Sequence, residues 1–353
     1  MAQLFVPLSL RSVTFRNRIW VSPMCQYSSQ DGLPNDWHFV HLGGFAAGGA
    51  GLVMVEASGV SPEGRITDRD SGIWSPAHAE AFRRIVTFVE EQGAVAGIQL
   101  AHAGRKASTE VPWRGGKPIV EGPRAWQPLA PSAIAFRPGE SAPRAMMKED
   151  IARTIADFAQ AARYARDAGF RVVEIHAAHG YLIHEFLSPL SNHREDEYGG
   201  SRENRMRFAL EVTAAVREAW PAELPLFIRI SATDWAEGGW ELGDSLVLAT
   251  RLRDLGADLI DCSSGGLVPH AKIAVGPGYQ VQFARAIREG AGIATAAVGM
   301  ITEARQAEEI VAGGAADAVF LARQMLRDPH FALTAARDLG ADGPWPVQYE
   351  RAR

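Results

Sequence analysis

Two histidines and a tyrosine follow a short apolar run and could together bind and polarise a substrate oxygen. The run extends from Val172 to Ile175, and the side chains that follow it are His176, His179 and Tyr181. Its β-branched residues favour a buried parallel strand. Imidazoles at this spacing, with a phenol close behind, can converge on one small volume at the end of such a strand. A site that stabilises negative charge developing on an oxygen needs donors of this kind.

These residues have two alternative interpretations. Histidines at this spacing are often buried residues whose ring nitrogens are hydrogen-bonded to neighbours, so the pair alone leaves a structural role open. A zinc site is the second alternative, but zinc takes three or four protein ligands. The nearest further ligands, His184 and Glu185, lie beyond the strand end at an unfamiliar spacing. We therefore expect no metal here, while a structural and a catalytic role both remain open.

The composition is that of an ordinary globular protein. The chain has 353 residues and a formal net charge of -5. This charge lacks the basic excess that binding to nucleic acid requires. No apolar run is long enough to span a bilayer, and the first residues lack the basic-then-apolar order of a signal peptide. The two cysteines, Cys25 and Cys262, can form neither a disulfide framework nor an iron–sulfur cluster. We expect a cytoplasmic protein that acts on a small molecule, without a nucleic-acid or membrane partner.

Apolar strands alternate with helices along the whole chain. The expected strands are residues 18–24, 51–59, 94–100, 172–175, 225–231, 259–263, 294–300 and 318–322. The expected helices are residues 36–49, 76–92, 149–168, 201–220, 243–255, 278–288, 303–312 and 329–339. This order predicts a single (β/α)8 TIM barrel over residues 1–353. A doubly wound open sheet is the alternative, although no Gly-x-Gly-x-x-Gly motif follows a strand as a Rossmann domain would require.

Two segments depart from this alternation. Residues 105–147 are rich in proline and are expected to form a long excursion that caps the barrel. Residues 340–353 form a C-terminal tail.

In a barrel of this type, polar residues at the C-terminal ends of the strands share one mouth. Each has a structural interpretation when taken alone: Gln99 could cap a strand, Arg229 could pair with Asp261 or Glu174, and Cys25 could be an inert buried thiol. Their arrival at one mouth favours a functional site. Besides the histidines and Tyr181, the strand ends supply Cys25, Tyr27, Ala57, Gln99, Arg229, Gly265, Gly266, Gly299 and Arg323.

The layout of these residues suits a flat heterocycle with a phosphate tail. Gly299 and the pair Ala322-Arg323 follow strands seven and eight, where many barrels bind phosphate through backbone N–H groups. The amide of Gln99 matches the N–H and C=O edge of an isoalloxazine. The fixed cation of Arg229 matches the negative charge that this ring gains on reduction. We therefore expect FMN as the cofactor.

Several long motifs in order resemble the Old Yellow Enzyme family of FMN-dependent ene-reductases, most closely its thermophilic-like or YqjM-like branch. The resemblance covers nearly the whole chain. It rests on the segments SPMCQY (22–27), QLAHAGRK (99–106), HAAHGYL (176–182), SNHR (191–194), DEYGGS (196–201) and QYER (348–351).

The resemblance implies that NADPH or NADH reduces FMN, which then reduces the activated C=C bond of an α,β-unsaturated carbonyl or nitro compound. It implies that His176 and His179 bind the substrate oxygen, Tyr181 protonates the α-carbon and Tyr27 contacts the substrate. Arg351 resembles a C-terminal arginine that reaches a neighbouring subunit's site, which implies a homodimer or homotetramer with shared sites. The residues implied to bind FMN are Ser22, Pro23, Met24, Cys25, Ala57, Gln99, Arg229, Gly299, Ala322 and Arg323.

Cys25 would lie beside the flavin and tune its potential. Ala322 departs from the glycine that is usual in the family, and its β-carbon could crowd the phosphate. Three alternatives to an ene-reductase are another FMN barrel dehydrogenase, such as a dihydroorotate-type enzyme, a flavin-free lyase or aldolase, and a non-catalytic binding barrel. The lyase would need a lysine at a strand end, and we expect none there.

Overall fold

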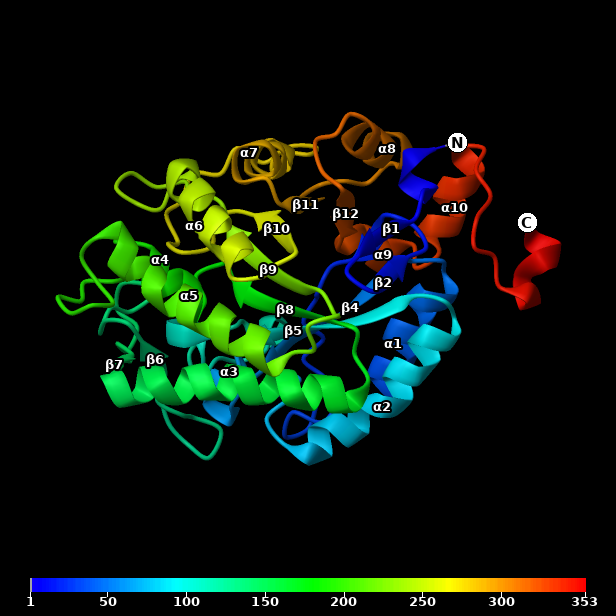
Figure 1. Cartoon of the computed structure of the whole chain (residues 1–353). Coiled ribbons are helices and arrows are strands. Elements are labelled where there is room, and N and C mark those ends of the chain that lie inside the picture. The colour runs from blue at the N-terminus through cyan, green and yellow to red at the C-terminus, as the bar shows by residue number, and fades with distance from the viewer. Residues whose placement is uncertain (1) are drawn as a thin grey trace.

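Eight parallel strands close into a barrel in the computed structural model of the chain, which describes residues 2–353 (Figure 1). Each strand pairs with the next along the chain, and the last pairs with the first through Leu321 and Val21. The barrel predicted from the strand–helix alternation is therefore confirmed. The strands are β3 (Ile19–Val21), β4 (Leu52–Gly59), β5 (Val95–Ala101), β8 (Val172–Ala177), β9 (Leu226–Ser231), β10 (Leu259–Ser263), β11 (Ala294–Val298) and β12 (Ala318–Leu321).

Aromatic side chains close the N-terminal end of the barrel. The ring of Trp20 lies 5.6 Å from that of Phe227 and 5.4 Å from that of Phe320. A hairpin of β1 (Leu8–Leu10) and β2 (Val13–Phe15) covers this end and places Phe15 4.7 Å from Trp20. The hairpin was not predicted, because its strands are too short to show an apolar period. With this end plugged, the polar strand ends are left at the opposite mouth.

Helices surround the barrel (Figure 1), and their ends follow local chemistry. Ser201 caps its helix by accepting a hydrogen bond from the Asn204 amide, as predicted. The helix expected at residues 278–288 begins later, at Val281, because Gly278 has a φ of +66° and belongs to the preceding turn. The helices are α1 (Asp36–Ala47), α2 (Pro76–Glu91), α3 (Lys148–Ala168), α5 (Arg202–Ala219), α6 (Leu242–Asp254), α7 (Val281–Ala291), α8 (Ala304–Ala312) and α10 (Phe331–Asp338).

Two short helices that were not predicted follow strands at the mouth. They are α4 (Leu182–Leu187), after β8, and α9 (Arg323–Arg327), after β12. All six residues of α4 are buried, so its sequence shows no amphipathic period. These helices determine where the chain turns after the candidate site residues.

The proline-rich excursion contains little regular structure. It holds the 3₁₀ turns η3 (Gly104–Lys106) and η4 (Pro112–Arg114), and a pair of two-residue strands, β6 (Leu129–Ala130) and β7 (Arg144–Ala145). The C-terminal tail ends in the 3₁₀ turn η5 (Val347–Ala352), which stands away from the barrel in Figure 1. Between residues 2 and 353, no helix combines the length and apolar character needed to cross a membrane.

Candidate active site

Three rings meet edge to face at the C-terminal end of β8. The ring centroids of His176 and His179 are 5.2 Å apart, with an interplanar angle of 85°. The Tyr181 ring lies 5.0 Å from His176 at 75°. His176 is the last residue but one of β8, and the other two lie in the turn that follows. One side chain within β8 and two in the next turn thus face a common volume.

The turn that carries His179 and Tyr181 has a backbone that few other sequences could adopt. Both His179 and Gly180 have positive φ, +59° and +71°. A β-carbon on Gly180 would lie 2.3 Å from the carbonyl oxygen of Gly266, so only glycine fits there. The amide of His179 donates to Ser231 Oγ at 2.9 Å, and that of Gly180 donates to His184 Nδ1 at 2.9 Å. These bonds hold a strained turn in one conformation.

A buried, hydrogen-bonded pair of side chains lies behind this turn. The Nε2 atom of His184, on α4, is 2.8 Å from Oδ1 of Asp234, and both side chains are inaccessible to solvent. Asp234 also accepts hydrogen bonds from Ser188 Oγ at 2.6 Å and from the Trp240 amide at 2.7 Å. Because Nδ1 of His184 accepts the Gly180 N–H, its own proton is on Nε2, facing the carboxylate. The pair therefore anchors the active-site turn from below.

Lys106 reaches the same turn from η3, which lies beyond the end of β5, so no strand end itself supplies this lysine. Its Nζ donates to the carbonyl oxygen of His179 at 2.7 Å and to that of Gly266. Its ammonium lies 4.2 Å from the Phe136 ring centroid and 5.5 Å from that of Tyr181. Burial lowers the pKa of Lys106 to about 7. The lysine was missed because it follows β5 by several residues and a 3₁₀ turn returns its side chain to the mouth.

The donors at the mouth are electrically neutral. Burial lowers the pKa of both His176 and His179 well below the usual value, and the charge of Arg229 lowers it further. Burial also raises the pKa of Tyr181, so its phenol stays protonated. Each imidazole therefore carries one N–H, and the phenol carries its O–H. Neutral donors in a dry site suit an acceptor oxygen that becomes negative during a reaction.

A cluster of charged and polar groups lies inside the barrel beneath these rings. Arg229 Nε is 3.1 Å from Asp261 Oδ2, and its Nη1 donates to Ser22 Oγ at 3.0 Å. Gln99 donates from Nε2 to Glu174 Oε1 at 2.7 Å. Burial raises the pKa of both Glu174 and Asp261. Of the two partners considered for Arg229, the structure shows Asp261.

A cavity of about 350 Å³ extends from Arg229 to the ends of β11 and β12. Gly299 lines it with a φ of +117°, and a β-carbon there would lie 2.6 Å from Gln280 Nε2. Arg323 also lines it, and no carboxylate of residues 2–353 lies within ion-pair distance of this guanidinium. Ala322 belongs to the lining as well, so the cavity persists despite its β-carbon. An unpaired cation and a glycine at one end, with Arg229 at the other, fit a phosphate-bearing ring.

The loop after β3 completes the rim. Tyr27 has a φ of +50°, and its ring meets Trp113 of the excursion edge to face at 5.8 Å. Burial raises its pKa, with Cys25 and Tyr181 adding to the effect. Burial, with the nearby charges of Asp70 and Glu56, raises the pKa of the Cys25 thiol, so it stays protonated. Among the other expected residues, Pro23 and Met24 are half-buried, and Ala57 is buried on β4.

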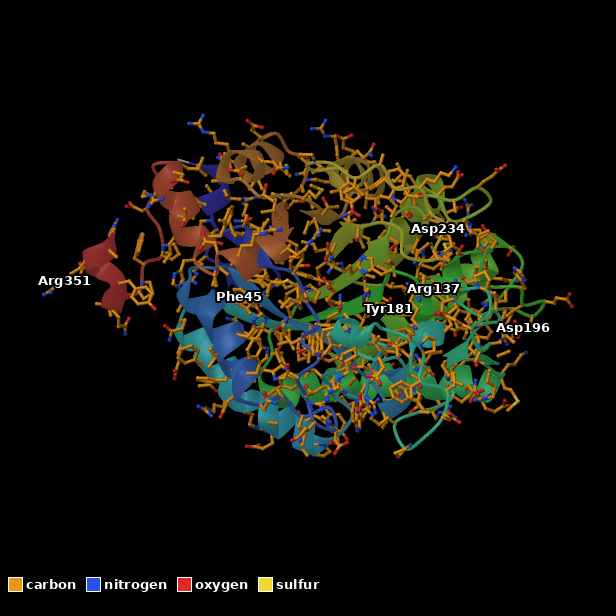
Figure 2. All side chains as sticks on the ribbon, turned by 180° about the vertical axis from the view of Figure 1, so that it is seen from behind. Phe45, Arg137, Tyr181, Asp196, Asp234 and Arg351 are labelled. Atoms are coloured by element: carbon orange, nitrogen blue, oxygen red, sulfur yellow. The ribbon has the colours of Figure 1, made fainter. Side chains whose placement is uncertain are left out.

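Arg351 is not near these residues within one chain. It lies in the exposed turn η5, and Figure 2 shows it at the far end of the molecule from Tyr181. Its expected contact with a site therefore requires a second copy of the chain.

Three further residues of the site were not singled out from the sequence. Ser263 Oγ lies 2.7 Å from His179 Nε2, Ser231 accepts the His179 amide, and Gln280 donates to the Val298 carbonyl at 2.9 Å. Ser231 and Ser263 are the last residues of β9 and β10. The strand-end rule that selected Arg229 could have found both serines, whereas Gln280 precedes a helix and carries no such signal.

A family profile and curated relatives match nearly the whole chain. The profile of the NADH:flavin oxidoreductase / NADH oxidase family matches residues 3–342. The NADPH dehydrogenase of Bacillus subtilis (strain 168) is 52% identical over 351 residues, which is 99% of this chain and 98% of that protein. The NADPH dehydrogenase of Geobacillus thermodenitrificans (strain NG80-2) is 50% identical over 350 residues, with 99% and 98% covered.

Solved structures agree in fold. Morphinone reductase in complex with tetrahydroNAD has a TM-score of 0.79 and 30% identity, covering 96% of this chain and 91% of that one. An old yellow enzyme homologue from Zymomonas mobilis has a TM-score of 0.77 and 28% identity, covering 99% and 97%.

Proposed function

The chain belongs to the NADH:flavin oxidoreductase / NADH oxidase family, and we propose that it reduces the activated C=C bond of α,β-unsaturated carbonyl or nitro compounds. It is an FMN-dependent oxidoreductase that takes its electrons from NADPH or NADH. The observation that carries the proposal is the meeting of three neutral donors: the ring centroid of His176 lies 5.2 Å from that of His179 and 5.0 Å from that of Tyr181. We expect the ring of FMN to lie beside them and against Arg229, which is aligned with His176 on the neighbouring strand.

The lining of the cavity supports the assignment of Arg229, Gly299, Ala322 and Arg323 to FMN, and the motif resemblance supports that of the other residues. Arg323 and the backbone at Gly299 and Ala322 would hold the phosphate. Arg229 and Gln99 would face the ring, and Ser22, Pro23, Met24, Cys25 and Ala57 would line it. When bound, FMN accepts hydride from the nicotinamide and supplies it to the β-carbon of the alkene.

His176 and His179 would bind the substrate's carbonyl or nitro oxygen through their N–H groups. Electron density moves toward this oxygen as the β-carbon is reduced, so the two hydrogen bonds strengthen on the way to the transition state. Donors that bind the transition state more tightly than the ground state accelerate the reaction. Because both imidazoles are neutral, they polarise the oxygen without transferring a full proton to it.

Tyr181 would donate its phenolic proton to the α-carbon. Its raised pKa keeps that proton in place until a strongly basic, carbanion-like carbon is presented. The ammonium of Lys106, 5.5 Å from the ring centroid, would stabilise the phenolate that remains. Solvent that enters when the product leaves would then return the proton.

The experiment that tests this function uses the flavin as its own reporter. NADPH should bleach the flavin absorption of the purified protein, and an enone such as 2-cyclohexenone should restore it. The double variant His176→Ala/His179→Ala should keep FMN and still bleach, but reoxidation by the enone should slow by about 10²–10³ for each donor lost. His193→Ala, which changes an exposed histidine in the loop after α4, is the matched control. Enone reduction at the parental rate in the double variant, with FMN bound, would contradict the assignment.

We also propose that the protein works as a homodimer or homotetramer, with Arg351 entering a neighbouring site. The exposed tail that carries this residue supports this arrangement. Arg351→Ala should raise KM for the enone, and mixing it with the double-histidine variant should restore some native sites. We place the enzyme in the cytoplasm, where NADPH and NADH are made, which cell fractionation would test.

A further inference from the structure

Two adjoining hollows beside the mouth contain cations that the proposed chemistry does not use. The smaller, of about 90 Å³, begins at Tyr27 and is lined by Arg69, Arg114 and Arg124. It shares Arg69 and Arg124 with a larger hollow of about 860 Å³. The larger one lies between the loops at residues 29–33 and 62–69 and the excursion at 123–126. The shared lining residues place the two hollows next to each other, and Tyr27 places the smaller one beside the mouth.

The smaller hollow has an excess of positive charge. Its two carboxylates, Asp68 and Glu110, both pair with Arg124: Oδ1 of Asp68 is 3.5 Å from its Nη1, and Glu110 binds it directly. Arg69 and Arg114 have no carboxylate within ion-pair distance anywhere in residues 2–353. The two guanidinium groups are therefore left to meet an anion that enters the hollow.

The larger hollow has a different character. Arg65 lines it, but its guanidinium already donates to the carbonyls of Pro62 and Asp68 and lies over the Trp126 ring at 5.5 Å. The unpaired carboxylates of Asp31 and Glu63 line the same space. Arg69 and Arg124 line both hollows and favour phosphate where they lie, whereas an uncharged base and ribose suit the part beside Asp31 and Glu63. The charges thus separate a phosphate-sized compartment from a compartment wide enough for a nucleoside.

We propose that Arg69 and Arg114 bind phosphate groups of the ADP portion of the nicotinamide dinucleotide. The inference rests on the proposed function, because the nicotinamide must reach the mouth beside Tyr27 and the rest of the molecule must leave over an adjoining surface. Guanidinium groups bind phosphate oxygens through paired, charge-assisted hydrogen bonds. Two phosphate sources share this chemistry: the diphosphate present in both NADPH and NADH, and the 2′-phosphate that only NADPH carries.

The test follows the reductive half-reaction of the holoenzyme. Arg69→Gln, Arg114→Gln and the double variant are mixed anaerobically with NADPH or NADH, and flavin bleaching is recorded. Each lost guanidinium should raise the concentration for half-maximal bleaching by about tenfold, as expected for a charge-assisted hydrogen bond. A rise for NADPH alone assigns the 2′-phosphate, and a rise for both nucleotides assigns the diphosphate. Arg163→Gln, which removes an exposed arginine on α3, is the matched control.

Two further measurements separate this inference from the proposed function. Reoxidation of dithionite-reduced enzyme by an enone should be unchanged in the arginine variants, because no dinucleotide takes part. Binding of 2′,5′-ADP and of ADP, titrated calorimetrically, should weaken in parallel with the bleaching. Unchanged half-saturation for both nucleotides would overturn the inference. Because bleaching requires no alkene, this result stands even if no enone proves to be a substrate.

Discussion

Replacing Glu185 by glutamine should make the protein more stable at neutral and alkaline pH. Glu185 lies on α4 and is fully buried; its Oε1 accepts the Arg105 amide at 2.9 Å, and its Oε2 has no hydrogen-bond partner in residues 2–353. Burial raises its pKa from 4.5 to about 8, although Arg105 and Lys106 favour the charged form. The folded protein therefore holds a proton that the unfolded chain has released.

The size of the effect follows from that difference. For a carboxyl whose pKa is raised on folding, its contribution to stability is present below pH 4.5 and is lost as the pH rises to about 8. The loss is about 1.4 kcal/mol per pH unit, or about 5 kcal/mol over the whole window. Glutamine has the same shape and no proton to lose. The difference in unfolding free energy between Glu185→Gln and the parent should therefore grow between pH 5 and 8. Above about pH 8 the difference should stay constant.

Urea unfolding at fixed protein and FMN concentrations, repeated across this pH range, measures the difference. Glu218→Gln, at an exposed position on α5, is the matched control and should give no such slope. An infrared difference spectrum at pH 7 gives an independent reading, since the parent should show a protonated-carboxyl band that Glu185→Gln lacks. Parallel stability profiles for the two proteins, or a missing band, would refute the reasoning.

Three other outcomes follow from the turn after β8. Lys106→Met releases the carbonyls of His179 and Gly266 and should slow enone reduction by roughly tenfold or more, with FMN content unchanged, as measured by reoxidation kinetics. Gly180→Ala puts a β-carbon 2.3 Å from the Gly266 carbonyl at a φ of +71° and should destabilise the fold by about 1–3 kcal/mol in thermal or urea unfolding. Burial lowers the pKa of His176 and His179 well below the usual value but that of Lys106 only to about 7, so the pH profile of reoxidation is recorded in Lys106→Met. That profile should show no imidazole ionisation near pH 6.5, and a step there would contradict the lowered histidine pKa values.

The barrel could be predicted because its strands are buried on both faces. Such strands are continuous apolar runs, and β10 was placed at residues 259–263 as observed. The elements that were not predicted are those whose apolar residues show no helical or strand spacing. Each strand of the N-terminal hairpin has three residues, and α4 is buried on every side.

The sequence could predict which residues lie at the mouth of the barrel, but it could not predict the contacts among them. Strand ends meet at one mouth as soon as the barrel closes, which selected His176, Gln99 and Arg229 from the sequence alone. The partner of Arg229 depends on register, and the strands align Arg229 with Asp261 on one side and with His176 on the other. The position of the Lys106 side chain depends on how the 3₁₀ turn η3 folds back toward the mouth. No rule based on sequence spacing describes such a turn.

One physical cause, the exclusion of water, accounts for the protonation states across the mouth. It lowers the pKa of His176 and His179, and it raises the pKa of Tyr181, Glu174 and Asp261. With both carboxylates ionised, the cluster around Arg229 would be net negative and would oppose the charge that a flavin ring gains on reduction.

Burial disfavours the state in which both Glu174 and Asp261 are ionised. At the same time it keeps His176, His179 and Tyr181 uncharged. The groups that shield the mouth therefore matter to the chemistry without touching the substrate. The excursion contacts the mouth through Phe136, which lies over Lys106, and through Trp113, which lies against Tyr27. Opening the excursion should accordingly move the imidazole and phenol pKa values back toward their usual range and weaken catalysis, even with every donor still in place.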